Sequence, residues 1–228
     1  VIIFNTTGRN ITDQIPVGDN PNDICITKNN KYLFVANAND NSVSVINIKN
    51  RKVIETLTCS LYPDSPPGST TNGLALSADD KTLFIVNADN NCLTVFDVSK
   101  PGNSISKGFI PVGWYPTCVK AIDKKIFVTN GKGFSSFANP KGPSPVKRNV
   151  KHQADDEDGP QYIGGLMKGT LSIIDMPSAK QLSIYSQQVY KNTPYTKEKE
   201  LLSNGKTGNP IPKKIDHPSP IKHVFYNI

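Results

Sequence analysis

The sequence predicts an all-β fold built from repeated units of four short strands. Three observations predict this fold: an internal repeat with a period of 50 residues, short runs rich in β-branched and aromatic residues, and turn residues between those runs. The first 130 residues contain no sustained apolar spacing of three and four, which is the pattern of an amphipathic helix.

Residues 31–48 and 81–98 form the clearest pair of repeats. They align without a gap, and 7 of the 18 positions are identical, including Asn37 with Asn87. Most mismatches are conservative, such as Val35 with Ile85. A third copy begins at Lys125, but its second half returns only at residues 169–176. The sequence therefore predicts an insertion, residues 131–168, between two paired strands.

Each repeat resolves into four expected strands. They are residues 22–27, 32–37, 43–48 and 53–57 in the first complete unit, 73–77, 82–87, 93–98 and 108–112 in the second, and 117–122, 125–130, 170–175 and 182–186 in the third. Residues 1–6 and 11–17 are expected to be the last two strands of a preceding unit.

Four antiparallel strands recurring every 40 to 50 residues or so are typical of β-propeller blades. We predict a partial β-propeller of about three and a half blades over residues 1–190, with blades at about 1–18, 22–58, 73–113 and 116–190. Residues 191–220 are expected to be a linker, and residues 221–228 to be the first strand of a following domain. Because a blade without a neighbour leaves an apolar face in water, we expect the native protein to continue in both directions.

Composition excludes several classes. The longest apolar run, residues 1–4, is far too short to span a membrane. The net charge is +7, but no cluster interleaves arginine with stacking aromatic residues, so a nucleic-acid interface is not expected. The four cysteines form no Cys-x-x-Cys pair, which favours buried thiols, with a disulfide and then a metal site as the alternatives.

Two kinds of segment resemble the YVTN-type β-propeller repeat of bacterial and archaeal surface-associated proteins. One is the Val-Gly-x-x-Pro turn at residues 17–21 and 112–116, and the other is the pair of strand motifs at residues 34–37 and 42–47. The resemblance covers about residues 1–190 and implies the fold. It also implies a periplasmic or extracellular location.

A narrower resemblance is to bacterial proteins that fuse such a propeller to an alkaline-phosphatase-like phosphoesterase domain. It is carried by residues 108–116, 130–133, 161–165 and 218–226. It implies a phosphoesterase domain after this chain as the partner of the propeller. No residue here matches a metal ligand or nucleophile of that family.

Asn37, Asn87 and Asn130 recur at one position of three units, at the exit of the second strand. Asparagine tolerates left-handed backbone geometry and bonds its neighbouring backbone, so a repeated structural turn is expected. A ring of asparagines that binds a ligand is the alternative.

The insertion carries the remaining candidates. Phe134, Phe137 and Tyr162 would be costly to expose, so we expect them to contact a neighbouring domain. The acidic run at residues 155–158 places carboxylates consecutively, whereas calcium loops place their oxygen ligands at alternate positions, so a solvated loop is favoured over a calcium site.

We expect this chain to be a non-catalytic scaffold or interaction module, with no catalytic, metal or cofactor residue. No His, Glu or Asp recurs on the expected first strands, which would face the propeller axis. Two alternatives stay open: a surface module that binds a protein or a glycan, and a propeller hydrolase such as a lactonase.

Overall fold

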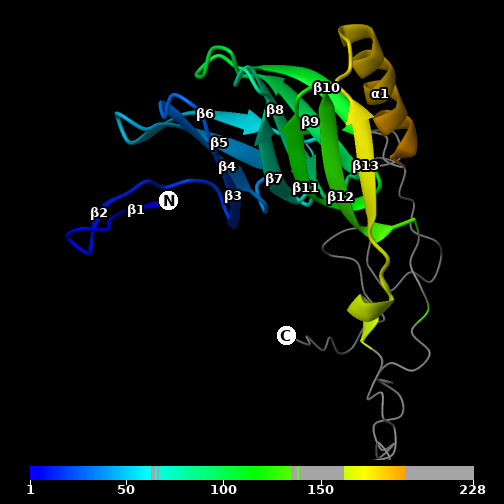
Figure 1. Cartoon of the computed structure of the whole chain (residues 1–228), viewed down its shortest axis with the longest axis horizontal. Coiled ribbons are helices and arrows are strands. Elements are labelled where there is room, and N and C mark those ends of the chain that lie inside the picture. The colour runs from blue at the N-terminus through cyan, green and yellow to red at the C-terminus, as the bar shows by residue number, and fades with distance from the viewer. Residues whose placement is uncertain (63–64, 66, 135–137, 139–161, 194–228) are drawn as a thin grey trace, which may run out of the picture. The chain divides into compact units, whose positions relative to one another are not determined.

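The structure is a computed structural model, and it describes residues 1–62, 65, 67–134, 138 and 162–193. These residues form a partial β-propeller of antiparallel sheets, as the sequence predicted (Figure 1). The second unit of the chain, residues 193–228, lies almost wholly outside the described residues, so the predicted linker and terminal strand stay predictions.

The first two blades each have four strands in sequence order. The first blade consists of β3 (Pro21–Ile26), β4 (Tyr32–Asn37), β5 (Ser42–Asn47) and β6 (Lys52–Thr58). The second blade consists of β7 (Thr71–Leu76), β8 (Thr82–Asn87), β9 (Cys92–Asp97) and β10 (Ile105–Pro111). Their middle strands are apolar on both faces because each blade is sandwiched between neighbours.

The third blade has three strands: β11 (Trp114–Ile122), β12 (Lys125–Gly133) and β13 (Thr170–Asp175). The prediction of a fourth strand at residues 182–186 is wrong, because helix α1 (Ala179–Asn192) occupies these positions. Leu182 and Val189 are buried one above the other on one helix face, and the N–H of Gln181 donates to Oγ of Ser178 at 3.3 Å. The N-cap serine and the helical spacing of the apolar residues specify a helix here, although the earlier units have their fourth strand at the equivalent place.

Helix α1 packs along β10, the outer edge strand of the second blade (Figure 1). Oγ of Ser186 accepts a hydrogen bond from the N–H of Phe109 at 2.8 Å, and the Tyr190 hydroxyl donates to the carbonyl of Leu61 at 3.0 Å. The rings of Tyr190 and Phe109 meet edge to face, with centroids 5.8 Å apart. The helix thereby covers an edge that would otherwise be open to pairing.

Strands β1 (Ile2–Asn5) and β2 (Asn10–Gln14) form a hairpin that precedes the first blade. Its Ile15 and Ile3 pack on Val35 and Ile46 of the first blade. The hairpin therefore stands where the outer half of a preceding blade would stand, in agreement with the half blade that the sequence predicted.

Two apolar layers hold the three blades together. The layer between the first and second blades includes Phe34, Val45, Leu83 and Ile85, all fully buried. The layer between the second and third blades is built from Phe84, Val86, Leu93, Val95, Ile110, Val119, Ile126 and Val128. Each such side chain contributes roughly 1.5–3 kcal/mol on burial, so these layers are the main stabilising element of the fold.

Candidate active site on the axial strands

The innermost strands of the three blades, β3, β7 and β11, lie next to one another. Gly73 of β7 allows this approach, because a Cβ atom there would lie 3.1 Å from Cγ2 of Val86 and 3.6 Å from Cα of Cys118. In each blade the pairing of the innermost strand shifts near its first residues, as in a β-bulge. The three strands thus form one axial wall.

The axial wall borders a hollow of about 470 Å³, to which all three inner strands contribute. Its charged lining consists of Asp23, Lys28, Asp80, Lys120 and Asp123. The remaining lining is mostly apolar and includes Ile24, Ile26 and Leu74. Charged and apolar side chains from all three inner strands thus line one open hollow.

Asp23 is the carboxylate that both lies on an inner strand and reaches the neighbouring blade. Its Oδ2 accepts a hydrogen bond from the N–H of Leu74 on β7, and its Oδ1 accepts one from the N–H of Ile24, each at 2.8 Å. These bonds fix the orientation of the carboxylate. A carboxylate offers about four lone-pair sites, so Asp23 retains acceptor capacity for a water or a ligand.

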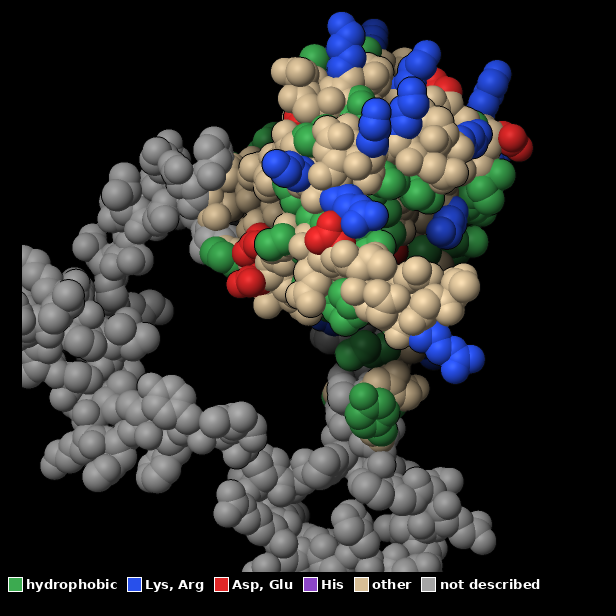
Figure 2. Space-filling model, turned by 90° about the vertical axis from the view of Figure 1, so that its left-hand side faces the viewer, with side chains coloured by type: hydrophobic (Ala, Val, Ile, Leu, Met, Phe, Trp, Pro, Cys, Tyr) green, Lys and Arg blue, Asp and Glu red, His purple; other side chains and the backbone are tan. Residues whose placement is uncertain are grey.

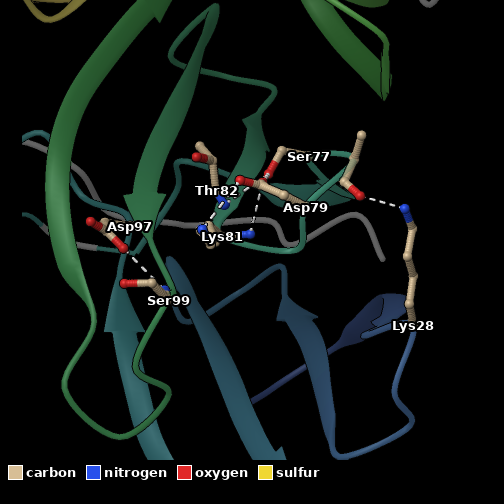
Figure 3. A network of polar contacts seen from close by, with 8 residues as sticks. Lys28, Ser77, Asp79, Lys81, Thr82, Asp97 and Ser99 are labelled. Carbon is tan, nitrogen blue, oxygen red and sulfur yellow. Dashed lines mark hydrogen bonds and ion pairs between the residues drawn. The ribbon is translucent and has the colours of Figure 1, made fainter.

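Lys28, which lines the hollow, links the turn after β3 to the turn between β7 and β8 of the second blade (Figure 3). Its ammonium donates to the carbonyl of Ala78, and its backbone N–H donates to Oδ2 of Asp80 at 2.7 Å. In the same turn, hydrogen bonds from the Ser77 hydroxyl and the Lys81 N–H lower the pKa of Asp79. Charge-assisted hydrogen bonds therefore hold this turn. Lys120 is the other lysine that lines the hollow, and no hydrogen bond from its side chain to another blade is described.

The cysteines are all free thiols in the described residues, and two are fully buried. Burial raises the pKa of the Cys59 thiol, and it raises that of Cys92 to about 12. On the axial wall, Cys25 also has a raised pKa, mainly because burial disfavours its thiolate. A thiol that stays protonated is a poor nucleophile, so the axial site has no activated cysteine at Cys25.

The predicted asparagines lie away from the hollow. Asn37 and Asn87 are the last residues of β4 and β8, whereas Asn130 lies within β12; all three are buried, and none has a left-handed backbone. Each side-chain amide donates to a hydroxyl on the third strand of its own blade, for example from Asn87 to Thr94 Oγ1 at 2.6 Å. The left-handed geometry assumed for these residues occurs instead at Asn41 and Asn91.

Asn41 and Asn91 are the structural asparagines that sequence reasoning missed. Each has a φ near +50° in the turn between the second and third strands of its blade. Oδ1 of Asn41 accepts from the N–H groups of Gly68 and Ser69 before the second blade, and Oδ1 of Asn91 accepts from the N–H of Tyr115 at the start of β11 in the third. The sequence signal for them was their shared position in the repeat, one period of 50 residues apart.

The insertion candidates are only partly described. Phe134 is 93% exposed and Tyr162 is 77% exposed, so neither contacts another part of the described chain extensively. Phe137 and the acidic run at residues 155–158 lie outside the described residues. The predicted contact with a neighbouring domain therefore stays a prediction.

Among the residues that the structure describes, no group of three or more His, Cys, Asp or Glu is placed to hold a metal ion. Within the same part of the chain, no helix is long and apolar enough to cross a membrane.

Residues 6–116 match the family model of the lactonases that form seven-bladed β-propellers. The matched residues span both four-stranded blades and the first residues of β11. Together with the sheets described above, the match supports a β-propeller family. The YVTN type and the fusion to a phosphoesterase stay predictions.

Solved structures resemble part of the chain. Hydrazine synthase of Kuenenia stuttgartiensis is 20% identical over 57% of this chain, with a TM-score of 0.47. A protein provisionally assigned as a 6-phosphogluconolactonase, from Bacteroides uniformis, is 16% identical over 57% of this chain, with a TM-score of 0.48. The chain spans 35% and 40% of these two solved chains, respectively. No curated protein matches the chain.

The prediction that this chain is not an enzyme is wrong, because the lactonase match points to a hydrolase. That prediction assumed that a catalytic residue type would recur on the first strand of every blade. Asp23 stands on β3 where β7 has Gly73 and β11 has Cys118, so the charged groups of the axial wall differ from blade to blade.

Proposed function

We propose that the axial wall belongs to a hydrolase that opens cyclic esters. The observation that carries this proposal is the match of residues 6–116 to the lactonase propellers. The matched residues include β3 and β7, which supply Asp23, Lys28 and Asp80 to the lining of the hollow. The charged side chains in this otherwise apolar hollow support placing the site there.

Opening a lactone by hydrolysis needs two kinds of assistance. A water attacks the carbonyl carbon and loses a proton to a base, and the carbonyl oxygen becomes an oxyanion that needs positive charge or N–H donors. The bond from the carbonyl carbon to the ring oxygen then breaks, and the ring oxygen takes up a proton. The product is a hydroxy acid.

Asp23 is the candidate base of this reaction. Its two backbone hydrogen bonds hold the carboxylate in one orientation at the edge of the hollow. Water held by its remaining lone pairs would lie against the apolar lining, where a lactone ring would be bound. Lys120 of β11 lines the same hollow and is the candidate group for stabilising the oxyanion.

The test is hydrolysis of an unsubstituted six-membered lactone by the full chain, followed as acid release. Asp23→Asn should lower kcat/KM by about 100-fold or more, the usual loss on removing a general base. Lys120→Met should also lower it. Asp13→Asn is the matched control, because Asp13 pairs with Arg51 on the exterior and does not line the hollow.

Two outcomes would refute the proposal. One is an unmodified chain that opens no lactone faster than buffer does. The other is an Asp23→Asn variant that opens the lactone as fast as the Asp13→Asn control does.

A further inference from the structure

The turns of the three blades fall into two sets at opposite ends of the strands. Because neighbouring strands are antiparallel, the turns from first to second strand and from third to fourth share one end, and the turns from second to third strand lie at the other. The blades are oriented alike, since Lys28, Asp80 and Asp123 line one hollow from the first turn of each blade. One common end therefore consists of residues 27–31, 48–51, 77–81, 98–104 and 123–124.

Basic residues dominate this end, which we call the cationic end. Its exposed basic residues are Lys28, Lys31, Lys49, Arg51, Lys81, Lys100 and Lys124. Its carboxylates are Asp79, Asp80 and Asp123. At the opposite end, the turns at residues 38–41 and 88–91 hold Asp40 and Asp89 and no Lys or Arg. The described part of the propeller thus has its positive charge gathered at one end.

Most of these basic side chains are not neutralised by a neighbour. Among the described residues, the ion pairs of the cationic end are Lys81 with Asp79 at 4.0 Å and Arg51 with Asp13 at 3.4 Å. Figure 2 views the molecule from the side toward which the β5–β6 turn projects in Figure 1, and Lys and Arg side chains spread over it with few Asp or Glu side chains between them. The lysines with no ion pair to another described residue include Lys31, Lys49, Lys100 and Lys124.

The charges of the cationic end are spread in two directions. The turns at residues 27–31, 77–81 and 123–124 follow the innermost strands, whereas those at residues 48–51 and 98–104 lead into the outer strands. A small anion would meet only a few of these charges, and a linear polyanion would follow one row of them. A planar anionic surface contacts the tips of all these turns at once.

We propose that the cationic end binds the surface of a lipid bilayer that contains anionic headgroups. Lysine suits this role, because its ammonium is a compact, hydrated charge that attracts headgroups without a fixed geometry. Attraction by several such charges adds up, at roughly fivefold in membrane partitioning for each one. None of the five turns has an exposed large hydrophobic side chain to insert, so the binding is electrostatic and reversible by salt.

The first test is co-sedimentation of the full chain with vesicles of phosphatidylcholine that contain about one third phosphatidylserine. The chain should bind these vesicles and should not bind vesicles of phosphatidylcholine alone. Raising the salt concentration from about 0.1 M to about 0.5 M should release it, because the screening length falls below the reach of the lysine charges. A chain that binds neither kind of vesicle, or that stays bound in high salt, would overturn the proposal.

The second test separates the cationic end from the net charge of the chain. Lys49→Gln/Lys100→Gln should weaken binding by about tenfold or more, and Lys49→Arg/Lys100→Arg should keep it. Lys168→Gln/Lys191→Gln is the matched control, because it removes the same charge from a position just before β13 and from the last turn of α1. Its effect should be less than about threefold. Equal losses in the two glutamine variants would show that binding follows net charge and would refute a specific end.

Two further measurements test the orientation and the kind of anion. Amide hydrogen exchange on the anionic vesicles should slow in the turns at residues 48–51 and 98–104 and stay unchanged at residues 38–41 and 88–91. Dextran sulfate, a linear polyanion, should displace the chain no better than free vesicles of equal total charge. Protection at the opposite end, or displacement by far less dextran sulfate, would contradict a planar lipid surface. These readouts measure binding alone, so they are independent of whether the chain opens lactones.

Discussion

The side-chain oxygen Oδ1 of Asn91 accepts a hydrogen bond from the backbone N–H of Tyr115 at 2.8 Å. Asn91 ends the turn between β8 and β9, and Tyr115 lies at the entry to the third blade. Both residues have a left-handed backbone, with φ values of +53° and +59°. One asparagine thus turns the chain within the second blade and holds the start of the third.

Substitution of Asn91 should separate these two roles. Asn91→Gly keeps the left-handed turn but loses the bond to Tyr115, so the free energy of unfolding should fall by about 1 kcal/mol. Asn91→Ala loses both the bond and the favourable turn geometry, and should cost about 1–2 kcal/mol more. Urea unfolding measures both. Asn30→Gly is the control, since Asn30 is also left-handed but lies in an exposed turn. If Asn91→Gly and Asn30→Gly lowered the free energy of unfolding equally, the bond from Tyr115 to Asn91 would not stabilise the fold.

Asn87 should be the most sensitive asparagine of the second blade. It is fully buried, and its amide donates to the carbonyl of Cys59 and to Thr94 Oγ1, while its Oδ1 accepts from the Thr71 hydroxyl. Asn87→Ala leaves these buried groups without their partner and should destabilise the fold by about 3 kcal/mol. The exposed Asn103 provides the comparison, and Asn103→Ala should change stability by less than about 0.5 kcal/mol. Thermal unfolding followed by circular dichroism would show the difference.

Glu55 of β6 links the first blade to the loop that precedes β10 in the second blade. Its carboxylate accepts hydrogen bonds from the N–H groups of Gly102 and Ser104 and from the Ser104 hydroxyl, at 2.7–2.9 Å. Glu55→Gln replaces one accepting oxygen by an amide that cannot accept, and should cost about 1–2 kcal/mol in urea unfolding. Ser104→Ala removes the hydroxyl alone and should cost less. If Ser104→Ala cost more stability than Glu55→Gln, the carboxylate would not be the main contributor to this contact.

The buried thiols should make the fold sensitive to alkaline pH. Burial raises the pKa of Cys92 to about 12 from a value of 9.0, so the unfolded chain loses its proton first as the pH rises. The stabilisation is fully present below about pH 9 and is lost as the pH approaches 12, with a slope of about 1.4 kcal/mol per pH unit for one thiol.

Cys92→Ser isolates this contribution, because Ser42 holds the same repeat position in the first blade and pairs with Asn37. The variant should lose less stability than the unmodified chain between about pH 9 and about pH 11, as measured by urea unfolding at each pH. Parallel pH profiles for the two proteins would be inconsistent with a buried, protonated Cys92.

Local sequence pattern predicted most of the strands. The expected strands at residues 32–37, 82–87 and 170–175 coincide with β4, β8 and β13, because alternating or continuous β-branched runs between turn residues specify a strand without reference to distant partners. The helix at residues 179–192 was missed because its positions were assigned by analogy with the earlier units. The Ser178 cap and the spacing from Leu182 to Val189 were present in the sequence.

The candidate site could not be predicted in the same way. Asp23 is a candidate because its carboxylate bonds Leu74, 51 residues away, at the edge of a hollow lined by three strands, and local pattern does not specify such a contact. The sequence by itself determined the repeat, the strands and the class of fold, since these depend on local pattern. The tertiary structure decided which charged groups meet on the axis and which asparagine clamps a neighbouring blade, because each of these depends on how one blade packs against the next.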